Sequence, residues 1–413
     1  MKRSTRNALH LYSLALSIII LVALLIGCAP QAASQPKDQA VTTPIKIGGS
    51  LPLTGPASYL GKFVKAGYDK WVADVNAKGG LLGRKVELVI YDDQSDPKNA
   101  ATLLDKVITV DKVNLLAGGY PGGSAAVQMP IAEQYRMVFV SMGGQWDSFQ
   151  KGFTFSFASP PLMNKWWYDA IWDWLAGMPH DQRPKTAAVY ALNYISSMDA
   201  HKIAPDVMKK LGIEVAVYEL YDFPLASAEP MISKAKAANA DMFYQASGFE
   251  DGMMAIKAAK AMNYNPKIMI HGAATLVPVW NQMLKEDANY IISGVPISPK
   301  LPYPGIAELN KWYTEENSAA KFCPEYILLG YSWMQTLQQG IEGAKTLDNA
   351  KIRDYLRNNE VSAVGGKFKF DKTGVPAPYS YAAQTLNGQL EVIWPQNVQT
   401  AKPVYPKPEW GTK

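Results

Sequence analysis

Two hydrophobic periods alternate along the chain from Ile45 onward. Short runs of β-branched and aromatic residues, typical of buried strands, are followed by stretches in which apolar residues recur every three or four positions. In the stretch 61–78, Tyr68 and Val75 lie on one helical face, and a pair of glycines ends the pattern. The pattern predicts strands at 45–49, 86–91, 114–117, 138–141, 186–191, 214–221, 241–245 and 267–271, and helices at 61–78, 99–110, 124–135, 198–211, 230–239, 251–262, 304–318, 326–344 and 349–358.

This strand–helix alternation predicts an α/β fold with parallel sheets covered by helices on both faces. It occurs in two blocks, 45–158 and 184–296, so we expect two Rossmann-like lobes. Between the blocks lies a Trp-rich helix (Trp166, Trp167, Trp172, Trp174), which we interpret as packing, with a ligand platform as the alternative. In open parallel sheets ligands bind beyond the carboxyl ends of the strands, so residues just after strands are the candidate site.

The N-terminus has the pattern of an export signal. Three basic residues precede an uncharged apolar run of 16 residues, Leu11–Ile26, which is short for a membrane-spanning helix of roughly 20 residues. The run ends in Gly27-Cys28, which resembles the lipobox of bacterial lipoproteins, in which the cysteine is acylated. We therefore expect residues 1–27 to be a signal peptide, Cys28 to carry lipid, and residues 28–44 to form a flexible tether. An uncleaved membrane anchor is the alternative.

Cysteine content and charge narrow the function. With Cys28 lipidated, Cys323 has no partner for a disulfide, so the fold depends on its hydrophobic core. Without residues 1–27 the chain has 38 basic and 36 acidic residues, a net charge of +2. A nearly neutral chain without basic clusters argues against nucleic-acid binding.

Three short motifs, in order and at fixed spacing, resemble the leucine/isoleucine/valine-binding family of ABC-importer substrate-binding proteins. They are 45–56 (IKIGGSLPLTGP), 76–85 (NAKGGLLGRK) and 91–97 (YDDQSDP). The resemblance implies the type I periplasmic binding protein fold, two lobes joined by three crossovers that close on a ligand by hinge motion. It places lobe 1 at 45–160 and 297–375, lobe 2 at 161–296 and 376–400, and an extended tail at 401–413.

The same resemblance implies the partners. We expect a monomer that captures a small organic ligand and delivers it to the permease of an ABC importer, on the extracytoplasmic side of a bacterial membrane to which Cys28 anchors it. A ligand sensor that docks on a membrane receptor has the same fold and remains the alternative.

The candidate ligand residues follow the strands of both lobes. In the family, a serine-bearing turn and backbone N–H groups after the fourth strand hold the ligand carboxylate, and glycine lets backbone approach the ligand. Amino-acid binders also place a carboxylate after the strand that ends here at His271, but this chain has Ala273 there. The resemblance and these positions predict ligand contacts at Tyr59, Tyr120, Gly123, Ser124, Gly144, Gln145, Trp146, Tyr194, Phe249 and Ala273.

We therefore expect a ligand other than a simple α-amino acid, such as an aromatic or aliphatic carboxylate or an amide. Glu250 or Asp251 could instead supply the missing carboxylate. His271 is either a ligand contact or, by our preference, a hydrogen-bonded core histidine.

We find no motif for catalysis, cofactor or metal. The chain has no G-x-S-x-G nucleophile elbow, no phosphate-binding loop and no H-E-x-x-H, and its four histidines are scattered. Asp92, Asp93 and Asp96 do not match the Ca²⁺ loop pattern, so we interpret them as turn and cap residues. A secreted two-lobed enzyme is thus the weakest of the three functional hypotheses.

Overall fold

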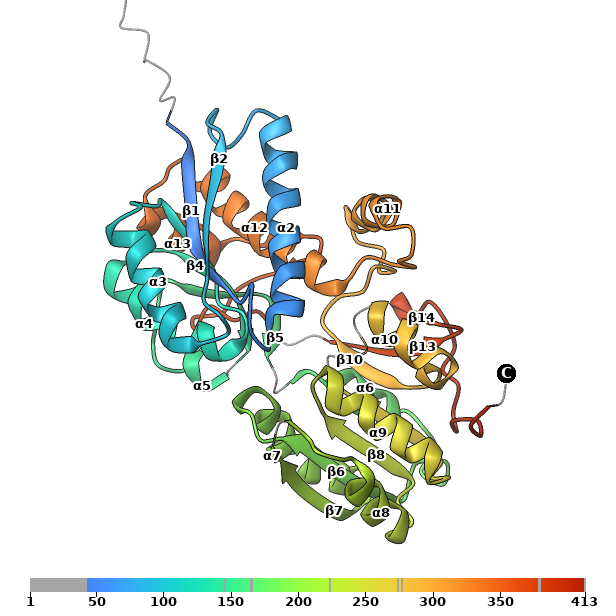
Figure 1. The fold of residues 1–413 in the computed structure, drawn as a ribbon. Coiled ribbons are helices and arrows are strands. Elements are labelled where there is room, and N and C mark those ends of the chain that lie inside the picture. The colour runs from blue at the N-terminus through green and yellow to red at the C-terminus, as the bar shows by residue number, and fades with distance from the viewer. Residues whose placement is uncertain are drawn as a thin grey trace, which may run out of the picture. The chain divides into compact units, whose positions relative to one another are not determined.

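Two large β-sheets with flanking helices, together with a small two-stranded sheet, form the folded part of the chain (Figure 1). The computed structural model describes residues 43–411 apart from 145, 164, 165, 223, 273, 274, 276, 277, 378 and 379. We call the first sheet and the helices packed on it lobe 1, and the second sheet with its helices lobe 2. The signal, Cys28 and most of the tether therefore lie outside the described residues.

The sheet of lobe 1 is entirely parallel, with strand order β2-β1-β3-β4-β5. Each strand is followed by a turn and a helix, as the two alternating periods predicted. Its elements are β1 (Ile45–Leu51), α2 (Ser58–Ala77), β2 (Val86–Asp92), α3 (Pro97–Thr109), β3 (Leu115–Gly118), α4 (Gly122–Tyr135), β4 (Phe139–Gly144), α5 (Trp146–Phe149) and β5 (Ser156–Met163).

Lobe 1 is completed by segments from the C-terminal part of the chain. Helix α12 (Glu325–Ala344) packs on α2 so closely that a Cβ at Gly67 would lie 2.3 Å from the carbonyl oxygen of Ile327. At Gly330 a Cβ would lie 2.4 Å from the carbonyl oxygen of Val64. The glycines on both helices therefore set the distance between them. The other C-terminal elements are α11 (Ile306–Glu316), α13 (Asn349–Asn358), β11 (Val361–Ala363) and β12 (Gly366–Phe368).

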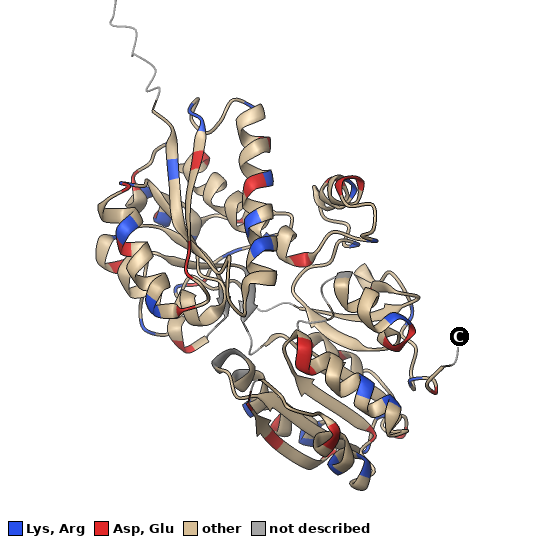
Figure 2. Ribbon diagram, in the orientation of Figure 1, with Lys and Arg blue, Asp and Glu red and all other residues tan. Residues whose placement is uncertain are grey.

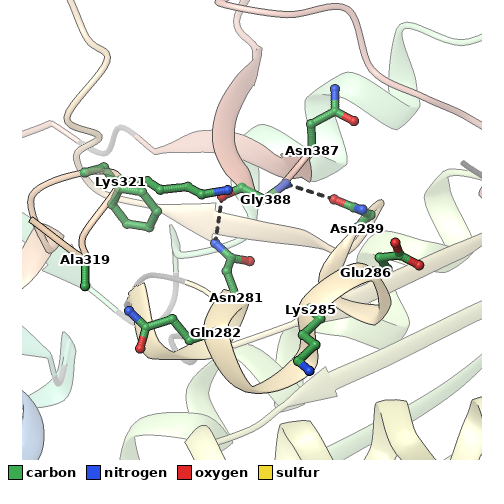
Figure 3. Close-up of a pocket in the computed structure, with 10 residues that line it drawn as sticks. Asn281, Gln282, Lys285, Glu286, Asn289, Ala319, Lys321, Asn387 and Gly388 are labelled. Atoms are coloured by element: carbon green, nitrogen blue, oxygen red, sulfur yellow. Dashed lines mark hydrogen bonds between the residues drawn. The ribbon is translucent and has the colours of Figure 1, made fainter.

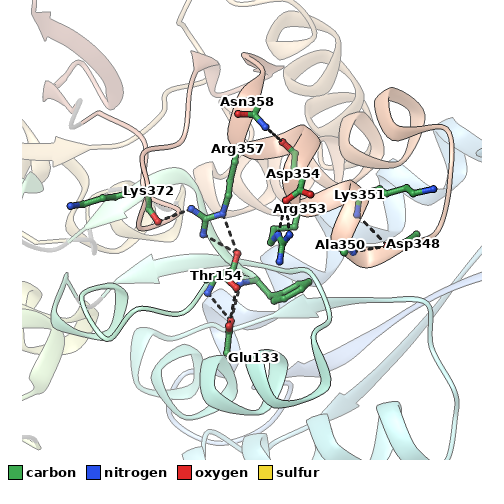
Figure 4. Close-up of polar contacts among 11 residues, drawn as sticks. Glu133, Thr154, Asp348, Ala350, Lys351, Arg353, Asp354, Arg357, Asn358 and Lys372 are labelled. Atoms are coloured by element: carbon green, nitrogen blue, oxygen red, sulfur yellow. Dashed lines mark hydrogen bonds and ion pairs between the residues drawn. The ribbon is translucent and has the colours of Figure 1, made fainter.

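Arg357 of α13 ties the two parts of lobe 1 together. Its guanidinium donates to the carbonyl oxygens of Thr154, at 2.8 Å, and of Lys372, at 2.6 Å. Glu133 of α4 accepts from both the backbone N–H and the hydroxyl of Thr154, so one residue is held from two sides (Figure 4). The bond from Arg357 to Thr154 joins segments 203 residues apart in the sequence.

The sheet of lobe 2 has strand order β14-β13-β10-β9-β8-β6-β7. The strands from β7 to β10 are parallel, and β13 and β14 add an antiparallel hairpin at one edge. Its elements are α6 (Asp169–Ala176), β6 (Thr186–Leu192), α7 (Ile195–Lys210), β7 (Glu214–Tyr221), α8 (Glu229–Ala237), β8 (Met242–Ala246), α9 (Phe249–Ala261), β9 (Ile268–His271), α10 (Pro278–Leu284), η3 (Lys285–Ala288), β10 (Ile292–Val295), β13 (Tyr381–Leu386), β14 (Gln389–Trp394) and η4 (Gln396–Val398).

The chain passes between the two sheets three times, after β5, after β10 and between β12 and β13. Most predicted strands agree with the observed ones to within two residues at each end, but strand β4 runs further and strands β5 and β10 to β14 were not predicted. Strand β4 continues to Gly144 and pairs there with Met163, so our end at Ser141 was wrong. Strand β5, which contains Pro160 and Pro161, was missed because proline lacks the N–H that a ladder needs; β5 tolerates both as the edge strand of its sheet.

The tryptophans between the two blocks contribute to packing. Trp172 and Trp174 of α6 are buried, and the ring of Trp172 lies 5.7 Å from that of Tyr244 on β8. Trp174 makes an edge contact with Tyr405 of the tail, with ring centroids 5.9 Å apart. Trp166, outside the helix, packs edge-on against Trp146 at 5.0 Å.

The C-terminal tail is held against lobe 2. The backbone N–H of Lys407 donates to the carbonyl oxygen of Lys267 at 2.8 Å, and the indole N–H of Trp410 donates to that of Tyr264 at 2.9 Å. The ammonium of Lys407 lies 3.6 Å from the centroid of the Trp410 ring. Hydrogen bonds and ring contacts thus order a segment that has no regular secondary structure.

Charges are spread over the folded part in small patches of both signs (Figure 2). Nine ion pairs join lysine or arginine to carboxylates among the described residues, several of them between neighbouring turns of one helix. This distribution agrees with the small net charge. Within the part of the chain that the structure describes, no helix combines the length and the apolar character needed to cross a membrane.

Candidate functional site

Glycines shape the turn between β3 and α4. Gly118 and Gly119 have φ angles of 143° and 72°, conformations that side-chain-bearing residues rarely adopt. They lead into α4, whose first residues are Gly122 and Gly123. The first N–H groups of a helix have no partner within the helix, so the N-terminus of α4 offers donors to an anion at this edge of the sheet.

Ser124, in the first turn of α4, supplies a further donor. Its side chain is only 1% exposed, and its hydroxyl has no hydrogen-bond partner among the described residues. Buried polar groups are nearly always paired in folded proteins, so the unpaired hydroxyl at the start of α4 makes this turn a candidate ligand site. The sequence prediction of Ser124 rested on the serine-bearing turn that the family resemblance implies and on its position after a strand, and the structure adds this unmet hydrogen bond.

Tyr120 and Tyr326 form one wall beside this turn. Their rings meet edge to face with centroids 5.4 Å apart, and both side chains are buried. Burial, with the proximity of Tyr326 and Tyr194, raises the pKa of Tyr120 well above its usual value, so the phenol stays neutral. Tyr120 was predicted from the sequence, but Tyr326 was missed because it follows no strand and enters the site on α12 from about 200 residues away.

Two of the predicted aromatic residues contact each other across the lobes. Tyr59 lies in the first turn of α2, and Phe249 is the first residue of α9. The centroids of their rings are 5.9 Å apart. Tyr59 also packs edge-on against Phe63 at 5.1 Å. Partial burial raises the pKa of Tyr59 to about 12, so its hydroxyl is a neutral donor and acceptor at physiological pH.

Tyr194 makes a second contact between the lobes. It precedes α7, and its hydroxyl oxygen lies 3.2 Å from the position that a Cβ at Gly123 would occupy. A side chain at Gly123 would therefore need the phenol of Tyr194 to move by a few tenths of an ångström. Lobe 2 thus presents a phenol directly to the N-terminus of α4.

Gly144 and Trp146 have other neighbours. Gly144 belongs to β4 and pairs with Met163, and Trp146 packs against Trp166. Gln145 and Ala273 lie outside the described residues. Ligand contacts at all ten predicted positions stay predictions.

In lobe 2 the two neighbouring acidic residues Glu250 and Asp251 differ in burial. Asp251 is fully buried, accepts a hydrogen bond from the hydroxyl of Tyr221, and accepts another from the backbone N–H of Gly248 at 3.1 Å. Its Oδ1 has no partner. Glu250 is exposed to solvent. Of the two carboxylates left open by the sequence, Asp251 is the one held inside the lobe.

His271 is a core residue, as we preferred. It is completely buried between the rings of Phe243 and Trp280, at centroid distances of 5.9 and 6.0 Å. Burial lowers its pKa to about 3, so the imidazole is neutral at physiological pH. The expected hydrogen bonds are absent, however, because neither ring nitrogen has a partner among the described residues.

Two cavities lie away from this group of residues. One, of about 460 Å³, is lined by polar side chains near the β13–β14 turn, where Asn281 donates to the carbonyl oxygen of Gly388 and Gly388 donates to Asn289 (Figure 3). The other, of about 330 Å³, lies beside His201, whose ring stacks on Tyr218 at 3.9 Å. None of the ten predicted ligand residues lines either cavity.

The three aspartates at the end of β2 and just after it, Asp92, Asp93 and Asp96, have structural partners. Asp92 accepts from the backbone N–H groups of Leu53 and Thr54, and Asp96 caps α3 through the N–H of Lys98. This confirms their interpretation as turn and cap residues. Among the described residues no group of three histidine, cysteine, aspartate or glutamate side chains could hold a metal ion.

A family model for periplasmic binding proteins matches residues 44–389, nearly the whole folded part. The chain belongs to the periplasmic binding protein family. It is similar to the Leu/Ile/Val-binding protein of Escherichia coli (strain K12), with 25% identity over 368 residues that cover 85% of this chain and 92% of that protein. The resemblance found in the motifs is therefore confirmed, and the chain is a solute-binding protein.

Solved structures of binding proteins share the fold. The branched-chain amino acid transporter substrate-binding protein LivJ from Streptococcus pneumoniae, in complex with isoleucine, has 19% identity, a TM-score of 0.74 and coverage of 85% of this chain and 98% of its own. A solute-binding protein of an ABC transporter from R. palustris, in complex with benzoate, has 18% identity, a TM-score of 0.74 and coverage of 88% and 98%. The expected two-lobed α/β fold of type I periplasmic binding proteins is confirmed.

This binding protein also buries a carboxyl group next to Tyr326. Glu325, the first residue of α12, is 0% exposed, and both of its oxygens lack partners. Burial raises the pKa of Glu325 well above its usual value, because a charge without a partner is costly in a dry interior. The side chain is therefore held in its neutral, protonated form.

We compare the free energy of unfolding of Glu325→Gln with that of wild type. This difference should shift in favour of Glu325→Gln as the pH rises from 4 to 8. Below pH ~4 both folded and unfolded wild type carry the proton; above it the unfolded chain ionises while Glu325 keeps its proton, so wild-type stability falls as pH rises. Each unit of pKa difference corresponds to about 1.4 kcal/mol. Urea unfolding of both proteins at pH 4, 6 and 8 measures the difference.

The exposed Glu308→Gln, on α11, is the matched control and should show no such trend. A stability difference for Glu325→Gln that is the same at all three pH values would contradict a neutral buried carboxyl.

Proposed function

We propose that this protein captures a small organic acid between its lobes and delivers it to the permease of an ABC importer. Delivery to an importer is supported by the family and by the benzoate- and isoleucine-bound binding proteins that share the fold. The single observation that carries the ligand class is the unpaired, buried hydroxyl of Ser124 at the N-terminus of α4.

The carboxylate of the solute would bind at lobe 1. The hydroxyl of Ser124 and the N–H groups of Gly122 and Gly123 all donate hydrogen bonds, and the N-terminal end of a helix carries partial positive charge. A carboxylate accepts several donors at once and needs no cation beside it. The neutral phenols of Tyr120 and Tyr194 add polar atoms to an otherwise apolar wall.

The body of the solute would lie between aromatic side chains. Tyr59 and Phe249 face each other from the two lobes, and Tyr326 lines the side of Tyr120. Flat or branched apolar groups fit such a surface, because aromatic rings offer a large apolar area at little cost in side-chain freedom. We therefore propose aromatic or branched aliphatic carboxylates as ligands and leave simple α-amino acids aside, since residue 273 is alanine.

A thermal-shift screen tests the ligand class. Benzoate, hydroxybenzoates and branched aliphatic acids at 1 mM should raise the melting temperature, since a ligand that binds only the folded state stabilises it. At 100 times the dissociation constant the gain is about 2.7 kcal/mol. Strong stabilisation by leucine or valine together with none by the carboxylates would overturn this ligand class, while mass spectrometry of any co-purified solute tests solute capture itself.

Replacing Ser124 by alanine should weaken carboxylate binding without unfolding the protein. The loss of one hydrogen bond to a charged group corresponds to about 1.5–3 kcal/mol, or roughly tenfold to a hundredfold in the dissociation constant. Isothermal titration with the best acid from the screen measures the change. Ser233→Ala, at an exposed serine of α8, is the control and should bind as wild type; an unchanged affinity for Ser124→Ala would rule out the proposed anion site.

We also propose that lipid on Cys28 holds the protein at the outer side of a bacterial membrane. The basic residues, the short apolar run and the Gly27-Cys28 junction support this, and residues 29–44 give the folded part a tether. The cysteine thiol is the acceptor of the lipid, so its oxygen analogue should not be acylated.

With Cys28→Ser, we expect the protein to leave the membrane fraction of expressing bacteria and to lose the mass of the lipid. Cell fractionation followed by mass spectrometry of the intact protein gives both readouts. Cys323→Ser, at the buried cysteine of lobe 1, should keep the protein in the membrane fraction. Equal membrane association of Cys28→Ser and wild type would refute the lipid anchor.

A further inference from the structure

Four polar side chains with unmet hydrogen bonds gather at the carboxyl edge of the lobe 2 sheet. The atoms without partners are Oε1 of Gln245, Oδ1 of Asp251, both ring nitrogens of His271 and the indole Nε1 of Trp280. All four side chains are completely buried. We call these four residues the lobe 2 polar cluster.

The cluster is held in place by contacts that fix each side chain. The amide of Gln245 donates to the hydroxyl of Tyr221 at 3.1 Å, and that hydroxyl donates to Oδ2 of Asp251. Gln245 and His271 are directly paired on the neighbouring strands β8 and β9, so their side chains lie on the same face of the sheet. The ring of Trp280 lies 6.0 Å from that of His271.

The cluster adjoins the residues through which the lobes meet. Phe249 lies between Trp280, at 6.3 Å, and Tyr59 of lobe 1, at 5.9 Å. Gln245 and His271 lie at the carboxyl ends of β8 and β9, where open parallel sheets bind their ligands. Through Trp280 the cluster therefore contacts Phe249, beside which the proposed solute would lie.

The unmet atoms include both acceptors and donors. Oδ1 of Asp251 and Oε1 of Gln245 accept hydrogen bonds, whereas Nε1–H of Trp280 donates. His271, neutral because burial lowers its pKa to about 3, offers one donor and one acceptor. An ammonium group only donates and would leave the indole unpaired; a hydroxyl both donates and accepts. The mixture therefore favours a hydroxyl over an ammonium.

We propose that the lobe 2 polar cluster binds a hydroxyl group of the solute, with Oδ1 of Asp251 accepting its hydrogen. This inference rests on the proposed function and narrows its substrate to hydroxylated organic acids, with the carboxylate at α4 and the hydroxyl at the far end. The buried carboxylate of Asp251 replaces an acidic residue after β9, where residue 273 is alanine.

The experiment measures the affinity of the full-length protein for four acids: benzoate, 3-hydroxybenzoate, 4-hydroxybenzoate and 3,4-dihydroxybenzoate. At least one hydroxylated acid should bind about tenfold more tightly than benzoate, the effect of one hydrogen bond to a charged acceptor. In Asp251→Asn this advantage should fall below roughly threefold, while the affinity for benzoate stays within about twofold of wild type. Isothermal titration gives all values, and leucine serves as the ammonium-bearing probe.

Two further variants separate recognition from folding. Gln245→Met removes an acceptor of the cluster and should also lower the affinity for the hydroxylated acid relative to that for benzoate. This variant keeps the proposal testable if Asp251→Asn melts at a lower temperature. Glu229→Gln, at an exposed carboxylate of α8, should leave every affinity unchanged.

Each remaining outcome overturns the proposal. Equal affinities for benzoate and all hydroxylated acids, equal losses for all acids in Asp251→Asn, or tighter binding of leucine than of the hydroxybenzoates would do so. If none of the acids binds, the hydroxylated substrate class is wrong; a different solute found in the purified protein would still support solute capture, whereas its absence would also count against the proposed function.

Discussion

The connection of parallel strands through helices places every strand-to-helix turn of a lobe at one edge of its sheet. Each turn ends at the N-terminus of a helix, whose first N–H groups have no partner within the helix. In lobe 1 this edge collects Tyr59, Tyr120 and Ser124; in lobe 2 it collects Tyr194, Gln245 and Phe249. These turns come from parts of the chain that are far apart in sequence. The connectivity of the fold brings them, and the polar and aromatic side chains they carry, to one edge of the sheet.

Lobe 1 depends on a close helix contact to complete this site. Glycines at 67 and 330 let α2 and α12 approach until backbone touches backbone, and this places Tyr326 against Tyr120 and buries Glu325 beside it. A bulkier residue at either glycine would push α12 outward and move Tyr326 with it. The packing of α2 against α12 therefore fixes the position of Tyr326 beside Tyr120.

Both lobes contain buried polar atoms that have no hydrogen-bond partner among the described residues. The hydroxyl of Ser124 in lobe 1 and the lobe 2 polar cluster both lie at carboxyl edges, where water or a solute could meet their hydrogen bonds. Their chemistry differs: lobe 1 offers donors at a helix N-terminus, and lobe 2 offers a mixture with a buried carboxylate. A solute that satisfied both would be bound at its two ends, which would favour closure of the lobes around it.

The sequence by itself determined the local elements and the family. Hydrophobic periods located most of the strands and helices, and the glycines before α4 indicated its turn. The serine-bearing turn that the family resemblance implies, together with the position after a strand, selected Ser124. These signals are local, since periodicity and glycine conformations act over a few residues. Only the tertiary structure decided the rest. The proline-containing β5, the β13–β14 hairpin beside β10, the arrival of Tyr326, and the bond from Tyr221 to Asp251 all depend on packing between segments distant in sequence, and no short pattern records which distant segments will meet.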